Sequence, residues 1–97
     1  MPQNDTYKDL AKALTRISDV KSMQNFLTDL CTPAELRALS ERWYVARLLQ
    51  EGELSYREIN AKTGVSTTTI SRVARFLREE PYGGYRTIFD NLEAKRG

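Results

Sequence analysis

Apolar residues recur at three- and four-residue spacing along most of the chain, and no segment keeps the two-residue alternation of a half-buried strand. This periodicity predicts an all-α fold of about six helices. The first helix is predicted over about residues 6–17, and a second begins at Ser18 or Asp19. The pattern fits either a helical hairpin or one long kinked helix at this point of the chain.

A third helix is marked at both ends. Thr32 suits the N-cap, Pro33 the first helical position, and Glu35 the position that completes a capping box. Gly52 offers a C-terminal stop after about Glu51. The third helix is therefore predicted to run from residue 33 to about residue 51.

The last part of the chain is expected to be shorter and more irregular. Pro81 lacks the N–H that a helix interior uses and disfavours the helical region for the residue before it, so a helix should end near Arg78. Residues 82–85 are predicted to form a loop. A final short helix is predicted over residues 85–92, before a polar tail at residues 93–97.

Between these regions, two short helices joined by a glycine turn are predicted over about residues 55–78. Ser55 and Glu58 can form a capping box, Gly64 can take a positive φ, and Ser66 can cap the second helix. The apolar positions place six residues on the outer side: Ser66, Thr67, Thr68, Ser71, Arg72 and Arg75. This pattern is typical of a helix-turn-helix that reads DNA.

The distribution of charge supports that interpretation. Residues 54–78 carry five Lys or Arg and one Asp or Glu, a net of +4, within a chain whose formal charge is only +2. The segments on either side each carry a net of −1. A local excess of positive charge on the proposed docking element is what neutralisation of DNA phosphates requires.

Residue types suggest separate roles on this surface. Thr67, Thr68 and Ser71 are short enough to approach base edges, whereas Arg57, Lys62 and Arg75 lie at the flanks and are expected to contact phosphates. Arg72 suits either a bidentate guanine contact or a phosphate contact, and the sequence leaves both open. The helix N-termini at Ser55 and Ser66 add backbone N–H donors for phosphate.

Composition bears on the number of domains, on catalytic or metal chemistry and on the location of the protein. With 97 residues, 40% of them hydrophobic, the chain is expected to be one domain, residues 1–97. There are no histidines and one cysteine, Cys31, so neither a catalytic centre nor a metal site is expected. The sequence contains no apolar run long enough to span a membrane and no signal-peptide pattern, which predicts a cytoplasmic protein without a membrane partner.

Several local strings resemble the Trp repressor superfamily, and in particular its YerC/YecD-like branch. The resemblance covers roughly residues 7–92, and its most specific parts are residues 30–39 (LCTPAELRAL), 48–59 (LLQEGELSYREI) and 69–72 (TISR). Asn60, where many helix-turn-helix units have Ala, is shared with these proteins. The resemblance implies an intertwined homodimer, with dimerisation helices in about residues 6–51 and 85–92 and a helix-turn-helix over about residues 55–78.

The same resemblance implies a ligand site, but two residues of that site differ from those of Trp repressors. Trp repressors hold the indole of tryptophan between two arginines, and the matching positions are Arg42 and Arg72, with Thr32 near the amino end of the ligand. Val73 stands where those repressors have a glycine, and Phe76 where they have a serine. Because both changes add apolar volume, we expect Val73 and Phe76 to fill the cavity, and we expect no cofactor and no tryptophan control.

These observations predict a regulator of transcription, most simply a repressor, that binds double-stranded DNA as a homodimer. Its operator is expected to be roughly palindromic, with half-sites about one helical turn apart. The alternative is a protein-interaction module that keeps the helix-turn-helix scaffold without binding specific DNA. The operator, the regulated genes and any small-molecule effector are not encoded in the pattern.

Overall fold

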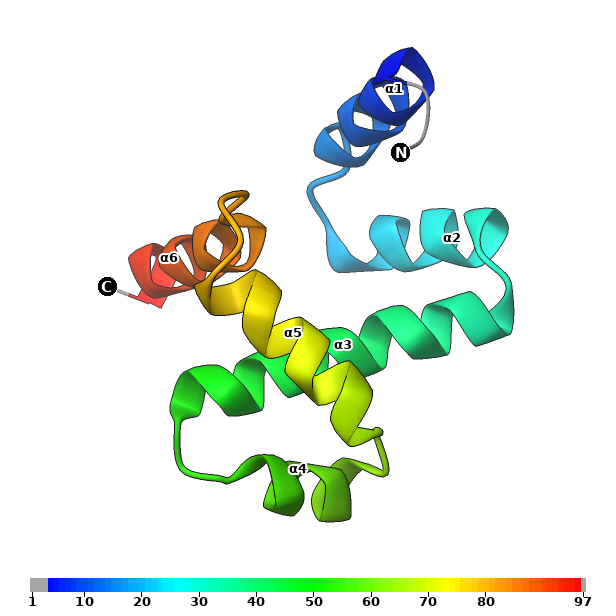
Figure 1. Ribbon diagram of the computed structural model, residues 1–97. Helices are drawn as coiled ribbons and strands as arrows, with labels where there is room; N and C mark the ends of the chain where they lie inside the picture. Colours follow the sequence, from blue (N-terminus) through cyan, green and yellow to red (C-terminus); the bar gives the residue numbers. More distant parts are fainter. Residues whose placement is uncertain (1–3, 97) are drawn as a thin grey trace. The chain divides into compact units, whose positions relative to one another are not determined.

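A computed structural model describes residues 4–96 of the chain, and over this range it contains six α-helices and no strand (Figure 1). The prediction of an all-α fold is confirmed. The chain divides into two compact units, Met1–Arg37 and Ala38–Gly97. A single domain over residues 1–97 stays a prediction.

The first unit contains α1 (Asn4–Thr15), α2 (Val20–Leu30) and the start of α3 (Pro33–Glu51). α1 starts and ends two residues earlier than predicted, and Arg16 and Ile17 instead form tight turns back to the carbonyls of Ala13 and Leu14. The first two helices are therefore separate, and the prediction of one kinked helix is wrong. The N-cap of α2 is Asp19, whose carboxylate accepts the N–H of Ser22 at 2.9 Å.

No side chain among residues 5–37 is fully buried. Apolar side chains of α1 and α2 remain partly or largely open to solvent, and Val20 is 77% exposed. An amphipathic helix gains most of its stability from burial of its apolar face. The first unit on its own therefore lacks much of the stabilisation that burial of its apolar helix faces would give.

α3 begins and ends where the sequence predicted. The N–H of Glu35 donates to Thr32 Oγ1 at 3.1 Å, and the N–H of Thr32 donates to Glu35 Oε1 at 2.8 Å, which completes the capping box. At the other end, Gly52 has a φ of 74° and donates its N–H to the carbonyl of Leu48. A left-handed residue directly after the last turn is a common helix terminator.

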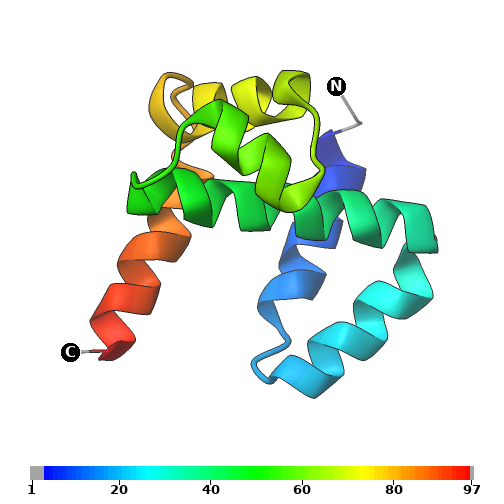
Figure 2. The same ribbon diagram turned by 90° about the horizontal axis from the view of Figure 1, so that it is seen from below.

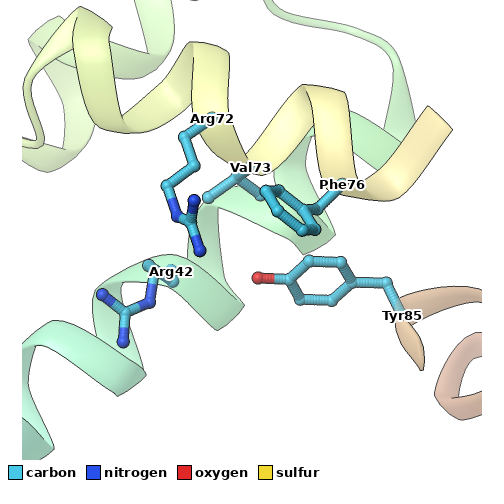
Figure 3. Close-up of a pocket in the computed structure, with 5 residues that line it drawn as sticks. All are labelled: Arg42, Arg72, Val73, Phe76 and Tyr85. Atoms are coloured by element: carbon cyan, nitrogen blue, oxygen red, sulfur yellow. The ribbon is translucent and has the colours of Figure 1, made fainter. Parts of the chain in front are cut away.

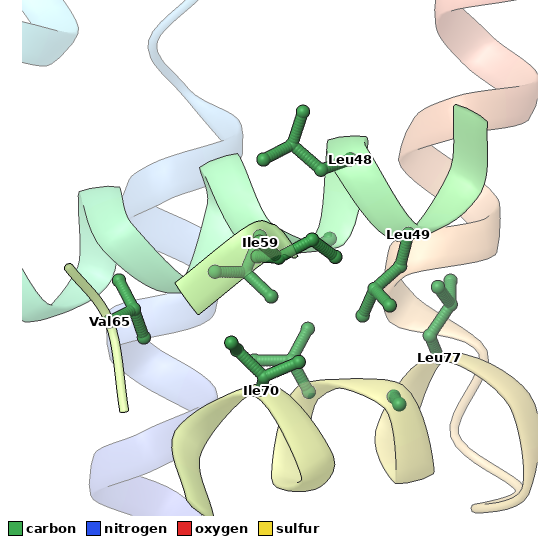
Figure 4. Close-up of a cluster of buried hydrophobic side chains, with 10 residues drawn as sticks. Leu48, Leu49, Ile59, Val65, Ile70 and Leu77 are labelled. Atoms are coloured by element: carbon green, nitrogen blue, oxygen red, sulfur yellow. The ribbon is translucent and has the colours of Figure 1, made fainter. Parts of the chain in front are cut away.

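The second unit is built around ten buried hydrophobic side chains (Figure 4). They come from the C-terminal part of α3, from α4 (Tyr56–Thr63), from the turn that follows it and from α5 (Thr67–Arg78). Complete burial of such a side chain stabilises a fold by roughly 1.5 to 3 kcal/mol. The ten residues are Val45, Ala46, Leu48, Leu49, Ile59, Val65, Ile70, Val73, Ala74 and Leu77.

The C-terminal helix differs from its prediction. α6 spans Gly84–Arg96, so it includes part of the predicted loop and most of the predicted polar tail (Figure 2). The carbonyl of Gly83 accepts both the N–H and the hydroxyl of Thr87, which starts the helix early. Glu, Ala, Lys and Arg in residues 93–96 favour helix, so α6 continues beyond its last apolar position. Residue 97 lies outside the described range.

Aromatic stacking holds α6 against α3. The ring of Trp43 lies 5.1 Å from that of Phe89 and 6.4 Å from that of Tyr85, centroid to centroid, in stacked geometry. All three side chains are partly buried against the core of the second unit. Trp43 is therefore a packing residue in this unit. No helix in the described range is long and apolar enough to cross a membrane.

The left-handed turn between α4 and α5 gives a direct test of the fold. Gly64 has a φ of 76°, and a Cβ there would meet no atom within 4 Å, so any penalty of substitution comes from the backbone. Gly64→Ala is expected to lower the free energy of unfolding by about 1 to 2 kcal/mol, as measured by urea denaturation. Gly84→Ala is the matched control, because Gly84 also has open space but no positive φ. Equal losses in the two variants would contradict this explanation.

Candidate nucleic-acid interface

The first helix of the candidate interface, α4, is fixed by its N-terminus. Ser55 Oγ accepts the N–H of Glu58 at 3.1 Å, and Glu58 Oε1 accepts the N–H of Ser55 at 2.8 Å. The predicted capping box is confirmed. The bond from the Ser55 N–H, followed by the Ser55 side chain, lowers the pKa of Glu58. The carboxylate thus stays ionised beside the positive end of the helix.

The turn that joins α4 to α5 is held by hydrogen bonds from the side chains of Asn60 and Thr63. Asn60 Nδ2 donates to the carbonyl of Val65 at 2.8 Å. Thr63 Oγ1 donates to the carbonyl of Ile59 at 2.7 Å and accepts the N–H of Val65 at 3.0 Å. These bonds satisfy part-buried backbone groups, which explains why a polar Asn fits a position that is often Ala in such units.

α5 presents a polar face opposite its buried one. Ser66 caps it by accepting the N–H of Thr69 at 3.2 Å, as predicted. Ile70, Val73, Ala74 and Leu77 are buried beneath. Every residue predicted to contact DNA is exposed: Arg57, Lys62, Ser66, Thr67, Thr68, Ser71, Arg72 and Arg75. The arrangement matches the predicted outer surface of a helix-turn-helix, and we call these eight residues the reader surface.

Arg72 is exposed, but its guanidinium does not extend straight into solvent. It lies over the ring of Phe76, with Cζ 4.4 Å from the ring centroid. Cζ of Arg75 lies 5.2 Å from the same centroid, and Nε of Arg75 is 3.8 Å from Glu80 Oε2. Both arginines are therefore held along the surface of α5 by their neighbours.

Beside the reader surface there is a small recess of about 130 Å³. Its lining comprises Arg42 from α3, three residues of α5 (Arg72, Val73 and Phe76) and Tyr85 from α6. In Figure 3 the Arg72 side chain extends from α5 towards α3, the guanidinium of Arg42 is turned away from it, and the Tyr85 hydroxyl points towards the arginines. The two arginines that the resemblance linked to a ligand are thus brought together, while Thr32 belongs to the first unit, where it caps α3.

Arg78 connects two helices of the second unit. It donates from Nη2 to the carbonyl of Leu49 at 3.3 Å and so ties the end of α5 to the last turn of α3. An ion pair between Arg47 and Glu51 would be the simplest expectation from their four-residue spacing. None forms within 4 Å, since Arg75–Glu80 is the sole ion pair in the described part of the chain. Arg placed before Glu is the weaker order for such a pair.

The positive charge of the helix-turn-helix is consequently almost unneutralised. Arg57, Lys62 and Arg72 have no acidic partner within 4 Å among residues 4–96, and Arg75 has only the long contact to Glu80. In the same range no group of three His, Cys, Asp or Glu side chains is arranged to hold a metal ion. A surface with unneutralised positive charge suits a polyanion.

Comparison with known proteins agrees with this geometry. A family model described as "Trp repressor protein" matches residues 5–93. The chain belongs to the Trp repressor family. Within that family, it is 43% identical over 86 residues to the Bacillus subtilis protein named "Uncharacterized protein YerC", a match covering 87% of this chain and 79% of the relative. This places the chain in the YerC-like branch, as the sequence predicted.

Other members of the Trp repressor family support the same assignment. A "Trp operon repressor homolog" of Aliivibrio fischeri is 36% identical over 90 residues, which are 90% of this chain and 83% of that protein. The crystal structure of a TrpR-like protein from Eubacterium eligens superposes with a TM-score of 0.83 at 36% identity, covering 94% of this chain and 92% of the other. The family model and these relatives are named for repressors, so family membership indicates a regulator.

Proposed function

We propose that this member of the Trp repressor family is a sequence-specific transcriptional repressor that inserts α5 into the major groove of double-stranded DNA. The observation that carries the proposal is the reader surface: eight exposed hydroxyl-bearing or cationic residues on two helices whose undersides are buried in one core. A rigid underside matters because base recognition requires side chains held at fixed positions.

The chemistry of α5 divides between base and phosphate contacts. Thr67, Thr68 and Ser71 lie in its first turns, where hydroxyls can donate to or accept from base edges and Thr methyls can touch the thymine methyl. Arg57, Lys62 and Arg75 supply phosphate contacts that fix the register but carry no sequence information. Arg72 lies next to both sets of residues, those proposed to contact bases and those proposed to contact phosphates.

We infer that the functional unit is a homodimer. The first unit supports this, because α2 has no buried residue and both α1 and α2 expose apolar side chains. A second copy is the simplest partner able to cover them, and a twofold pair of readers matches a palindromic operator. Family membership favours the same assembly.

We also propose that DNA binding needs no tryptophan. Val73 is 1% exposed in the core, and the ring of Phe76 lies against Arg72 and lines the recess, whose volume is only about 130 Å³. Close-packed side chains leave little room for a second ring system.

DNA binding tests the proposal most directly. Operators selected from random DNA should be bound by the wild type and about 5- to 150-fold less tightly by Arg72→Ala, from a loss of about 1 to 3 kcal/mol, as measured by fluorescence anisotropy. A salt slope reduced by about 1 would assign Arg72 to a phosphate, and relaxed selectivity at one base pair to a guanine. Arg47→Ala is the control, since it removes the same exposed charge away from the reader surface. Failure to select any sequence, or a protein partner competing for this face, would favour the protein-interaction module.

The assembly can be measured without DNA. Sedimentation equilibrium at micromolar protein concentration is expected to give twice the chain mass of 11.2 kDa. Val20→Glu, which puts a charge on the exposed apolar face of the first unit, should shift the equilibrium towards monomer. A wild-type monomer at these concentrations would refute the homodimer.

The proposal about tryptophan has a calorimetric test. Titration of the wild type with L-tryptophan is expected to give no saturable heat in the micromolar range, because the recess that Val73 and Phe76 line has a volume of only about 130 Å³. The control is the same titration of the double variant Val73→Gly, Phe76→Ser, in which the recess is enlarged. Micromolar binding to the wild type would overturn this part of the proposal.

A further inference from the structure

Phe76 lies on α5 between the reader surface and the recess, and it is only partly buried. It contributes no hydrogen bond and is not among the ten core residues. Its ring nevertheless contacts the two arginines of α5 that face outward, Arg72 at 4.4 Å and Arg75 at 5.2 Å from Cζ to the ring centroid. Both distances lie within the range of a cation–π interaction.

The ring is itself supported from the turn after α5. Tyr82 stacks on Phe76 with the two planes 16° apart and the centroids 6.3 Å apart. Tyr82 is otherwise largely open to solvent, at 73% exposure. Glu80, in the same turn, contacts Arg75 through the long ion pair. The turn therefore contacts both the ring of Phe76 and one of the arginines beside it.

An aromatic partner differs from an acidic one in a way that matters here. A carboxylate would hold Arg72 but cancel its charge, whereas the ring attracts the guanidinium through its quadrupole and leaves the full positive charge in place. No acidic side chain of residues 4–96 lies within 4 Å of the Arg72 guanidinium. Phe76 thus restricts an otherwise flexible arginine without weakening its attraction for phosphate.

We propose that Phe76 is a positioning residue for DNA binding: its ring, supported by Tyr82, orders Arg72 and Arg75 on the reader surface before DNA arrives. This rests on the proposed function and deepens it. A long side chain immobilised only on binding lowers affinity through lost rotamer freedom, and ordering it beforehand removes that loss. Phe76, which lines the recess, then affects DNA binding through Arg72 and Arg75.

A double-mutant cycle tests the proposal. Phe76→Leu, which keeps an apolar side chain but removes the ring, is expected to weaken operator binding about 3- to 10-fold. Phe76→Tyr keeps the ring and should stay within about twofold of the wild type. In an Arg72→Ala, Arg75→Ala background, Phe76→Leu should have almost no effect. An equal loss in both backgrounds would show a merely structural role, and tighter binding by Phe76→Leu would show that the ring holds the arginines away from DNA; either result overturns the proposal.

Tyr82→Ala provides a second variant whose folding is not in question, because the side chain is largely exposed. It should weaken binding in the same direction as Phe76→Leu and by less, and it too should lose its effect in the double-arginine background. An effect of Tyr82→Ala that persists in that background would contradict the proposal that Tyr82 acts on the two arginines through Phe76.

A readout without DNA separates failure of this inference from failure of the proposed function. In the free protein, the Nε–H signal of Arg72 should show a ring-current shift and restricted motion by NMR relaxation, and Phe76→Leu should abolish both. Arg57 is the internal reference, since no ring lies over its guanidinium in residues 4–96. If Arg72 is as mobile as Arg57 in the wild type, the inference fails even if DNA is bound; if the protein selects no DNA, the proposed function fails whatever the NMR result.

Discussion

The arrangement of the second unit depends on the burial of the undersides of α4 and α5 against the C-terminal part of α3. Ile59, Ile70, Val45 and Val73 are its largest fully buried side chains, and they come from all three helices. Because these side chains interlock at close to crystalline density, neither short helix can rotate without opening a cavity. The orientation of the polar faces of α4 and α5 is therefore set by buried residues.

Around this core, polar side chains set the boundaries of each element. Ser55, Thr32 and Ser66 begin three helices, Gly64 turns the chain between α4 and α5, and Arg78 connects the end of α5 to α3. Each bond satisfies a backbone group that a helix end would otherwise leave unpaired. Apart from the capping Glu58 and the long contact between Glu80 and Arg75, no acidic residue of the described range pairs with this interface, and its positive charge stays available.

The ends of α3, α4 and α5 and the buried face could be predicted from the sequence because they depend on local patterns: helix caps, positive-φ glycines and apolar spacing. The long α6 could not, since periodicity registers only the residues that face a core and not those that extend a helix by propensity. The roles of Asn60, Arg78 and Phe76 were also beyond the pattern, because each depends on a partner brought near by folding. Exposure of the predicted reader residues followed from periodicity, while the direction of the Arg72 side chain did not.

The absence of any fully buried side chain in residues 5–37 has a consequence for how much active protein a cell maintains. A chain that completes its burial by pairing becomes more stable as its own concentration rises. Unpaired copies expose apolar helices and are the ones that proteases degrade first. On the proposed assembly, operator occupancy would then fall more steeply than protein synthesis when expression declines, which would sharpen the response of the regulated genes without any bound metabolite.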